Sequence, residues 1–251
     1  MICKTPSDFD RVRAVARMTA EILRQAADAV APGVTTLEIN DLIHGLITAR
    51  GATPCFLNYR GFPKSACVSI NHEVIHGIPA AGRVIQSGDI VSIDVGVHHD
   101  HTCGDCATTV AVGGVTPERQ RLLDATRRAL EAGVAAAVAR NRVGDISHAV
   151  QTVVESAGCS VVRDFVGHGI GRRLHEDPQV PNFGKPGRGT ILRPGHVLCV
   201  EPMVNAGACE VRVLDDKWTV VTRDGLPSAH FEHMVLVTEG APEILTPWRG
   251  A

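Results

Sequence analysis

Apolar residues recur along the chain in two similar rounds, each with helical spacing first and strand spacing afterwards. In the helical segments the apolar side chains return every three to four residues and form one face, whereas in the strand segments they alternate or run continuously. The pattern predicts helices over about 7–30 and 36–49, strands within 55–112 that are clearest at 68–70 and 90–95, helices over about 117–139 and 145–157, and further strands after 161. This order predicts a protein that mixes helices with sheets.

The ends of the predicted helices carry residues that commonly begin and end helices. Ser7, Thr36 and Thr116 are expected as N-caps, because a hydroxyl oxygen can accept a hydrogen bond from a backbone N–H of the first turn. Gly51 and Gly158 are expected to end the second and fourth helices, since glycine readily adopts the left-handed backbone of a helix terminus. The helix boundaries are therefore predicted by two independent signals, the apolar periodicity and the capping residues.

A constant shift of 107 residues relates the two rounds. It maps the segment SGDIVSID (87–94) onto PGHVLCVE (194–201), and it matches glycine with glycine, apolar with apolar, and Asp94 with Glu201. We therefore expect an internal repeat of two similar halves, each with helices covering a sheet. Asp94 and Glu201 are then expected to face each other across a pseudo-two-fold axis.

The composition argues against several classes of function. The 251 residues carry a formal net charge of −2 and only 4% aromatic residues, so neither a basic surface nor a stacking platform for nucleic acid is expected. No apolar run is long enough for a signal-peptide core or a membrane span, and we expect a cytoplasmic protein without a membrane partner. The eight irregularly spaced cysteines indicate free thiols, and the single C-x-x-C of Cys103 and Cys106 is weak support for a zinc site.

Four carboxylates lie on or beside strands whose apolar runs indicate burial: Asp94, Asp105, Glu201 and Glu232, the last in a strand expected over 230–237. Buried carboxylates need a cation or protonation, and acids that face each other repel unless a divalent metal lies between them. His168, between two glycines in GHGIG, adds an imidazole that a ligand can approach closely. Four carboxylates and one imidazole suit two divalent ions that activate a water for hydrolysis.

Two further histidines lie beside glycine-containing motifs and are not needed as metal ligands. His76 in HEVIHGIP and His175 in RRLHEDP are candidates to donate to a developing oxyanion or to transfer a proton near a metal-activated water. His98, His99 and His101 crowd a predicted hairpin turn and are expected in a solvated loop instead.

These motifs occur in the order and at the spacings of a known family, and the chain resembles the type I methionine aminopeptidases. The matching stretches are NYRGFPKSACVSINHEVIHGIP (58–79), SGDIVSIDVG (87–96) with Asp105 eleven residues after Asp94, GHGIGRRLHEDPQV (167–180), CVEPMVNAG (199–207) and HFEHMVLVT (230–238). The resemblance implies an α+β pita-bread fold with two pseudo-symmetric halves, each with helices packed on an antiparallel sheet, and a metal site between them. It also implies one catalytic domain over 1–251, with internal halves of about 1–115 and 116–251.

The resemblance assigns roles to the candidate ligands. Asp105 and Glu232 are implied to bridge two metal ions. Asp94 is implied to complete the second ion, and His168 and Glu201 to complete the first. Glu201 is also implied to carry the proton of the nucleophilic water.

The resemblance also describes the substrate side of the site. His76 and His175 are implied to bind the substrate amide and to stabilise the tetrahedral intermediate. The methionine side chain is expected in an apolar pocket that contains aromatic rings and sulfur, which suits a thioether. The lining is expected from Tyr59, Phe62, Cys67 and Trp218, with Phe56 and Leu174 at the wall.

The implied activity is removal of the initiator methionine from nascent proteins and peptides when the second residue is small. A monomer with a transient ribosome contact is expected. Two rival functions stay open: an X-Pro dipeptidase or aminopeptidase of the same fold, and a non-catalytic paralogue that binds ribosomes. The metal is Co, Mn, Fe(II) or Zn, since the same ligands accept all four.

Thiols occupy two positions where the family usually has hydroxyl side chains. Cys106 follows Asp105, where small hydroxyl residues are usual, and Cys199 lies two residues before Glu201, where threonine is common. We hypothesise that these thiols shift the metal preference toward softer ions such as zinc, or make the activity sensitive to oxidation.

Overall fold

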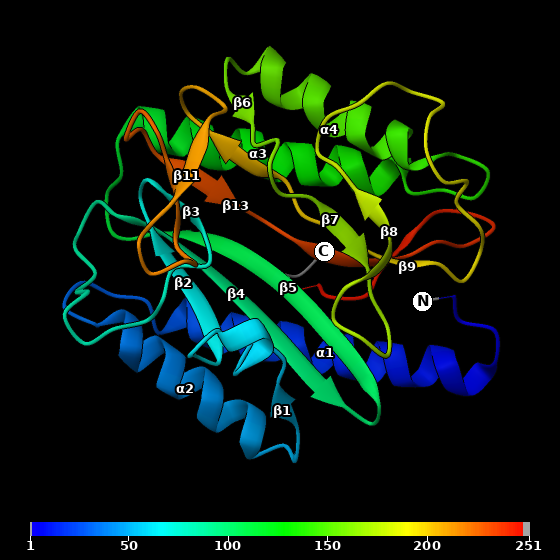
Figure 1. Cartoon of the computed structure of the whole chain (residues 1–251), viewed down its shortest axis with the longest axis horizontal. Coiled ribbons are helices and arrows are strands. Elements are labelled where there is room, and N and C mark those ends of the chain that lie inside the picture. Colours follow the sequence, from blue (N-terminus) through cyan, green and yellow to red (C-terminus); the bar gives the residue numbers. More distant parts are fainter. Residues whose placement is uncertain (1, 248–251) are drawn as a thin grey trace.

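The computed structural model describes residues 2–247, in which two pairs of helices enclose antiparallel strands (Figure 1). The first round of elements is α1 (Pro6–Asp28), α2 (Thr36–Thr48), β1 (Thr53–Pro54), the 3₁₀ helix η1 (Tyr59–Gly61), β2 (Ala66–Ile70), β3 (Glu73–Ile75), β4 (Ile90–His99) and β5 (Thr102–Ala111). The second is α3 (Pro117–Ala136), α4 (Val143–Ser156), β6 (Ser160–Val161), β7 (Gly167–Gly169), β8 (Glu176–Val180), β9 (Val197–Val200), β10 (Met203–Asn205), β11 (Val211–Val213), β12 (Val220–Thr222), β13 (Ser228–His230), β14 (His233–Leu236) and β15 (Glu243–Ile244). The predicted order of helices and strands is confirmed.

Each half has one main sheet covered by its own two helices. In the first half β4 pairs with β1 and β2 on one edge and with β5 on the other, while α1 packs on β4 and β5 and α2 packs on β2. In the second half the sheet order is β15-β14-β9-β7-β8, and α3 and α4 pack on each other and against this sheet. Figure 1 shows the blue pair α1 and α2 and the green pair α3 and α4 on opposite sides of the strands.

The helices are held by burial of their apolar faces. Ile22 and Leu23 of α1 and Ile43 of α2 are fully buried, together with Ile93 of β4. Leu130 of α3 is buried in the same way in the second half. Full burial of one such side chain contributes about 1.5–3 kcal/mol, so these contacts fix the helices on the sheets. Between residues 2 and 247, no helix is long and apolar enough to cross a membrane.

The 107-residue shift reappears in the pairing of the backbone. Thr35 forms an isolated antiparallel bridge with Val84, and Arg142 forms one with Ile191. Both bridges join the start of a helix to the segment that leads into a strand of the main sheet, β4 or β9. The internal repeat predicted from sequence is therefore visible as a repeated hydrogen-bonding pattern.

Glycines related by this shift share the same backbone conformation. Gly51 and Gly158 end their helices with φ of +68° and +73°, as predicted. Gly88 and Gly195 lie before β4 and β9 with φ of +93° and +90°. These left-handed conformations favour glycine because it has no Cβ.

Two of the three predicted N-caps are displaced by one or two residues. Thr5, not Ser7, caps α1, and Thr35, not Thr36, caps α2. In both cases an acidic residue three positions later bonds back to the backbone N–H of the cap, and this capping box decides which hydroxyl is used. Thr116 caps α3 as predicted and accepts a hydrogen bond of 3.3 Å from the N–H three residues later.

Candidate metal centre and substrate pocket

The hairpin of β4 and β5 brings Asp94 and Asp105 together. Asp94 pairs with Ala107 and Asp105 pairs with Gly96, so the two carboxylates occupy diagonal positions on one face of the sheet. Cys67 of β2 pairs with Asp94 from the other side and lies on the same face. The register of three strands thus defines one wall of the site.

The second sheet supplies the groups that face this wall. His168 on β7 pairs with Cys199 on β9, and Glu201 follows β9 by one residue. Glu232 lies directly before β14. Its backbone N–H donates to the carbonyl oxygen of Ala107 at 2.9 Å, and this bond ties the two walls together.

The strand expected over 230–237 is interrupted, which corrects the sequence prediction. β13 ends at His230 and β14 begins at His233, with Glu232 between them. The cause is the hydrogen bond from the Glu232 N–H to β5, which takes this residue out of the ladder of its own sheet. The interruption places the Glu232 side chain between the two sheets.

The glycines around His168 are required by close approach of the backbone. A Cβ on Gly167 would collide with the carbonyl oxygen of Cys199, and a Cβ on Gly169 would collide with that of Asp177. His168 is therefore held between strands that can approach only because its neighbours lack side chains.

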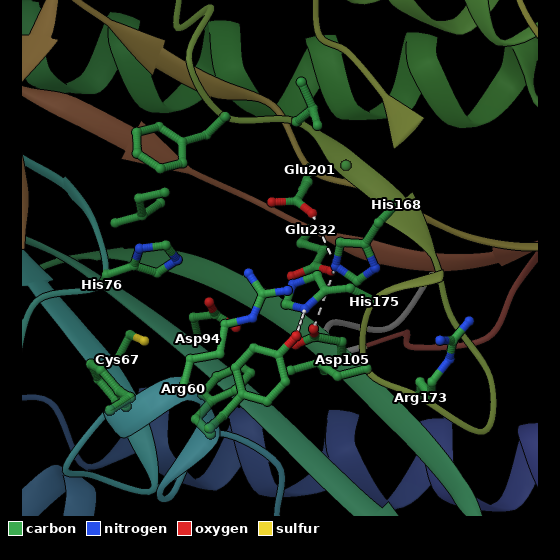
Figure 2. A pocket seen from close by; sticks show the side chains of 18 of the residues that line it. Arg60, Cys67, His76, Asp94, Asp105, His168, Arg173, His175, Glu201 and Glu232 are labelled. Atoms are coloured by element: carbon green, nitrogen blue, oxygen red, sulfur yellow. Dashed lines mark hydrogen bonds and ion pairs between the residues drawn. The ribbon is translucent and has the colours of Figure 1, made fainter. Parts of the chain in front are cut away.

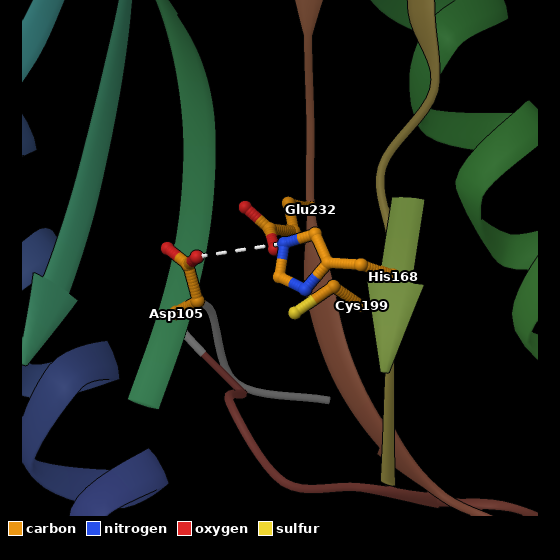
Figure 3. A group of neighbouring side chains, drawn as sticks. All are labelled: Asp105, His168, Cys199 and Glu232. Atoms are coloured by element: carbon orange, nitrogen blue, oxygen red, sulfur yellow. Dashed lines mark ion pairs between the residues drawn. The ribbon is translucent and has the colours of Figure 1, made fainter. Parts of the chain in front are cut away.

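The ring of His168 is oriented with Nε2 toward the carboxylates. Its Nδ1 donates to the carbonyl oxygen of Gly169 at 3.0 Å. Nε2 lies 3.8 Å from Oδ2 of Asp105 (Figure 3). It also lies 3.4 Å from Oε1 of Glu201 (Figure 2). Burial, and secondarily the neighbouring His175, lowers the pKa of His168 to about 3. The imidazole is therefore neutral near pH 7, and its Nε2 lone pair points at the carboxylates.

Burial raises the pKa of all four carboxyl groups. The pKa of Asp94 rises to about 6, although the nearby His230 acts in the opposite direction. The pKa of Asp105 lies well above its usual range, first by desolvation and then by the charges of Glu232, Asp94 and Glu201. Among residues 2–247, Oδ1 of Asp94 and Oδ1 of Asp105 have no hydrogen-bond partner. A divalent cation would offset the repulsion between the carboxylates and would bind the two oxygens that lack hydrogen-bond partners.

The donor atoms fit such a cation. Asp105, His168, Cys199 and Glu232 each offer an atom within 4.8 Å of the others, and all four residues are buried (Figure 3). Glu201 lies beside this group through its contact with His168. All five residues predicted as ligands therefore gather at one place.

The two thiols singled out in the sequence occupy different faces. Cys199 belongs to the buried group of donor atoms. Cys106 follows Asp105 on β5, so its side chain points to the opposite face, where it is buried in the apolar core. Cys103 and Cys106 are three residues apart on β5, so their side chains also point to opposite faces of the sheet. This arrangement gives no support to a zinc site at the C-x-x-C.

A pocket of about 600 Å³ opens onto the carboxylates (Figure 2). Every predicted substrate residue lines it: His76, His175, Tyr59, Phe62, Cys67, Trp218, Phe56 and Leu174. The rings of Phe62 and Trp218 meet edge to face, with centroids 5.1 Å apart. One side of the pocket is thus apolar and the other is lined by acids.

The two candidate catalytic histidines lie in this pocket. His76 has left-handed backbone with φ of +58°, and its ring meets Phe165 and Trp218 edge to face. Burial lowers the pKa of His76 to about 4. His175 Nδ1 lies 2.7 Å from the hydroxyl of Tyr59, and burial lowers its pKa as well. Both rings are therefore neutral near pH 7 and can donate only one proton each.

The comparisons with known proteins agree with this geometry. A family model described as metallopeptidase family M24 matches residues 10–239. The chain belongs to this family. A methionine aminopeptidase from Clostridium perfringens is 47% identical over 98% of each chain. The crystal structure of methionine aminopeptidase from Thermotoga maritima is 43% identical, with a TM-score of 0.95, 98% of this chain covered and 99% of that one.

The α+β pita-bread fold expected from the sequence is confirmed for this M24 metallopeptidase. A prolidase from Pyrococcus furiosus is similar in fold, with a TM-score of 0.77 at 20% identity, covering 98% of this chain and 65% of that one. At that identity the likeness concerns the fold alone.

Some residues at the site of this M24 metallopeptidase were not singled out in the sequence. His230 is buried with Nε2 3.7 Å from Oε2 of Glu201, and its position two residues before Glu232 was the available signal. Arg60 and Arg173 line the pocket itself. Nothing in their sequence context distinguishes them from ordinary surface arginines.

Proposed function

We propose that the chain is a methionine aminopeptidase that removes the N-terminal methionine of peptides and nascent proteins when the second residue is small. The observation that carries the proposal is the pocket, which places an apolar aromatic wall directly beside a buried group of acids and one imidazole. A thioether side chain suits the apolar wall, and a charged α-amine suits the acidic side. The relatives named methionine aminopeptidase match almost the full length of the chain.

Asp94, Asp105, His168, Glu201 and Glu232 would hold two divalent ions, which are Co, Mn, Fe(II) or Zn. When bound, the ions supply a water of lowered pKa as the nucleophile and polarise the scissile carbonyl. The support is the chemistry of the donor set and the two carboxylate oxygens of Asp94 and Asp105 without hydrogen-bond partners between residues 2 and 247.

The side chains around the acids have separate tasks in this proposal. Glu201 takes the proton of the attacking water, as the family resemblance implies, because its buried carboxylate lines the pocket and lies 3.4 Å from the ring of His168 among the proposed ligands. We assign Tyr59 as the donor to Nδ1 of His175, 2.7 Å away, which leaves the Nε2–H of this ring to donate to the substrate carbonyl. His76 holds the amide from the opposite side of the pocket.

The substrate methionine is held between rings. Phe62 and Trp218 form the end of the apolar wall, with Cys67 close to the acids. Phe56 and Leu174 complete the wall. We further propose a cytoplasmic monomer that contacts the ribosome transiently, as the family resemblance implies.

The test is release of free methionine from Met-Gly-Met and Met-Lys-Met after chelation and after return of Mn, Fe(II), Co or Zn. We expect metal-restored cleavage of the glycine peptide alone. His168→Ala is expected to lose more than about 100-fold in kcat/KM, because it removes a ligand rather than a supporting group. Cleavage of X-Pro dipeptides in place of Met-Gly-Met would contradict the proposal and favour the rival peptidase.

A further inference from the structure

The mouth of the pocket is shaped by an unusual backbone segment, 58–61. Asn58 and Arg60 have φ of +66° and +49°, and Gly61 has φ of +91°. Left-handed backbone at a residue with a side chain is unfavourable by about 1–2 kcal/mol. The segment is nevertheless closed by backbone hydrogen bonds, with Asn58 N–H donating to Phe62 O at 2.8 Å and Phe62 N–H donating to Tyr59 O at 2.9 Å.

This backbone aims the Arg60 side chain at the substrate path. Its guanidinium lies over the ring of Tyr59, 5.4 Å from the centroid, and Arg60 is one of the residues that line the pocket. Figure 2 shows Arg60 extending toward the middle of the pocket, whereas Arg173 lies on the far side beyond His175. The charge of Arg60 also contributes to the lowered pKa of His175, which places the two side chains within electrostatic reach.

Arg60 carries a positive charge without a paired carboxylate. Within the described part of the chain, no ion pair joins Arg60 to an aspartate or glutamate. The opposite side of the mouth is mixed, because Arg173 lies there with Glu176 and Asp177. The side formed by 58–61 is therefore the more positive of the two.

We propose that Arg60 is a specificity-determining residue that favours substrates with an acidic side chain at the third position. The inference rests on the proposed function, in which His175 contacts the amide between the first and second residues. Arg60 is exposed at the mouth and its guanidinium lies over Tyr59, whose hydroxyl meets His175, so in the proposed function it can reach the residue that follows the small second one. A guanidinium that is already in place over an aromatic ring loses little freedom when it pairs with a carboxylate.

The experiment uses three hexapeptide amides that differ only at the third residue: Met-Gly-Glu, Met-Gly-Gln and Met-Gly-Lys, each followed by the same three neutral residues. We expect kcat/KM to fall in the order Glu, Gln, Lys, with a total ratio of about tenfold at low salt that shrinks in 0.5 M salt. Blocked C-termini keep the terminal carboxylate from competing for Arg60.

Substitutions of Arg60 separate the effect of its charge on specificity from a structural effect of losing the side chain. In Arg60→Gln the Glu-to-Lys ratio is expected to fall to about one, and in Arg60→Lys most of it is expected to return. Arg173→Gln, the matched control on the far side of the mouth, is expected to keep the wild-type ratio. If a salt-dependent Glu-to-Lys ratio of kcat/KM remains in Arg60→Gln, the inference about Arg60 is overturned. In that case cleavage of the Met-Gly-Gln peptide still supports the proposed function. Failure of the wild type to cleave any of the three peptides would overturn both.

Discussion

At the scale of single residues, Cys199 places a thiol in the candidate metal centre. Its Sγ lies with donor atoms of Asp105, His168 and Glu232, and it is fully buried. Desolvation and the surrounding carboxylates raise the pKa of this thiol, so it stays protonated while no cation is bound. A cation that favours sulfur would displace the proton and gain a soft ligand.

Cys199→Thr is therefore expected to weaken zinc binding relative to manganese, by about tenfold in the ratio of dissociation constants. Competitive titration of the chelated protein with the two metals measures this ratio directly. Cys106→Thr is the matched control, because Cys106 is buried on the other face of β5. Equal shifts in both variants would contradict a role of Cys199 at the metal.

His196 predicts a dependence of stability on pH. It is buried before β9, and its Nδ1 accepts a hydrogen bond of 3.2 Å from the Arg193 N–H. Burial lowers its pKa below the unfolded value of about 6.5. Between the folded and unfolded pKa values, the unfolded chain binds a proton at His196 that the folded chain does not. The contribution of His196 to the free energy of unfolding is therefore most favourable above pH 6.5 and becomes less favourable as the pH falls below 6.5.

In the metal-free protein, wild type is expected to lose more free energy of unfolding between pH 7 and pH 5 than His196→Asn, which keeps an acceptor and cannot titrate. Urea denaturation at steps of half a pH unit measures the difference. Parallel curves for the two proteins would show that His196 does not titrate differently on folding.

At the scale of elements, the start of α1 shows how a capping box selects one hydroxyl among several. Thr5 accepts a hydrogen bond from the N–H of Asp8, and the Asp8 carboxylate accepts one from the N–H of Thr5. Ser7 lies inside the helix and takes no part in the cap. The two hydroxyls are only two residues apart, so they form a natural comparison.

Thr5→Ala is expected to lower the free energy of unfolding by about 1 kcal/mol, because the first turn loses its acceptor. Ser7→Ala is expected to change it by less than about 0.5 kcal/mol. Chemical denaturation of both variants beside wild type decides between them. A larger loss in the serine variant would restore the cap position expected from the sequence.

The same elements show how far the sequence carries a prediction. The gathering of the five proposed ligands could be predicted because acids buried beside apolar strands require a compensating cation or proton, and the family motifs fix their spacing. The break between β13 and β14 at 231–232 could not be predicted, because it depends on a hydrogen bond to β5, a strand that is remote in sequence. The direction of Arg60 also could not, because nothing in its local sequence demands left-handed backbone.

At the scale of the whole molecule, the proposed ligands are divided between the halves. Asp94 and Asp105 come from the β4–β5 hairpin, whereas His168, Glu201 and Glu232 come from the facing sheet. A bound cation therefore joins two layers that each carry their own helices. Binding to the folded state alone must stabilise the whole fold.

A cation at about 100 times its dissociation constant adds about 2.7 kcal/mol, which for a chain of this size raises Tm by about 5–10 °C. We expect this shift when Mn or Co is added to the chelated protein, measured by calorimetry. Asp105→Asn is expected to shift far less. An equal shift in the variant would place the stabilising ion elsewhere.

The division of the ligands also has a consequence for the moment at which the chain becomes an enzyme. Synthesis delivers Asp94 well before Glu232, so every intermediate that stops short of Glu232 lacks one of the proposed ligands. The proposed site is therefore incomplete for as long as the growing chain has not reached Glu232. We expect no turnover by any chain that stops before this residue.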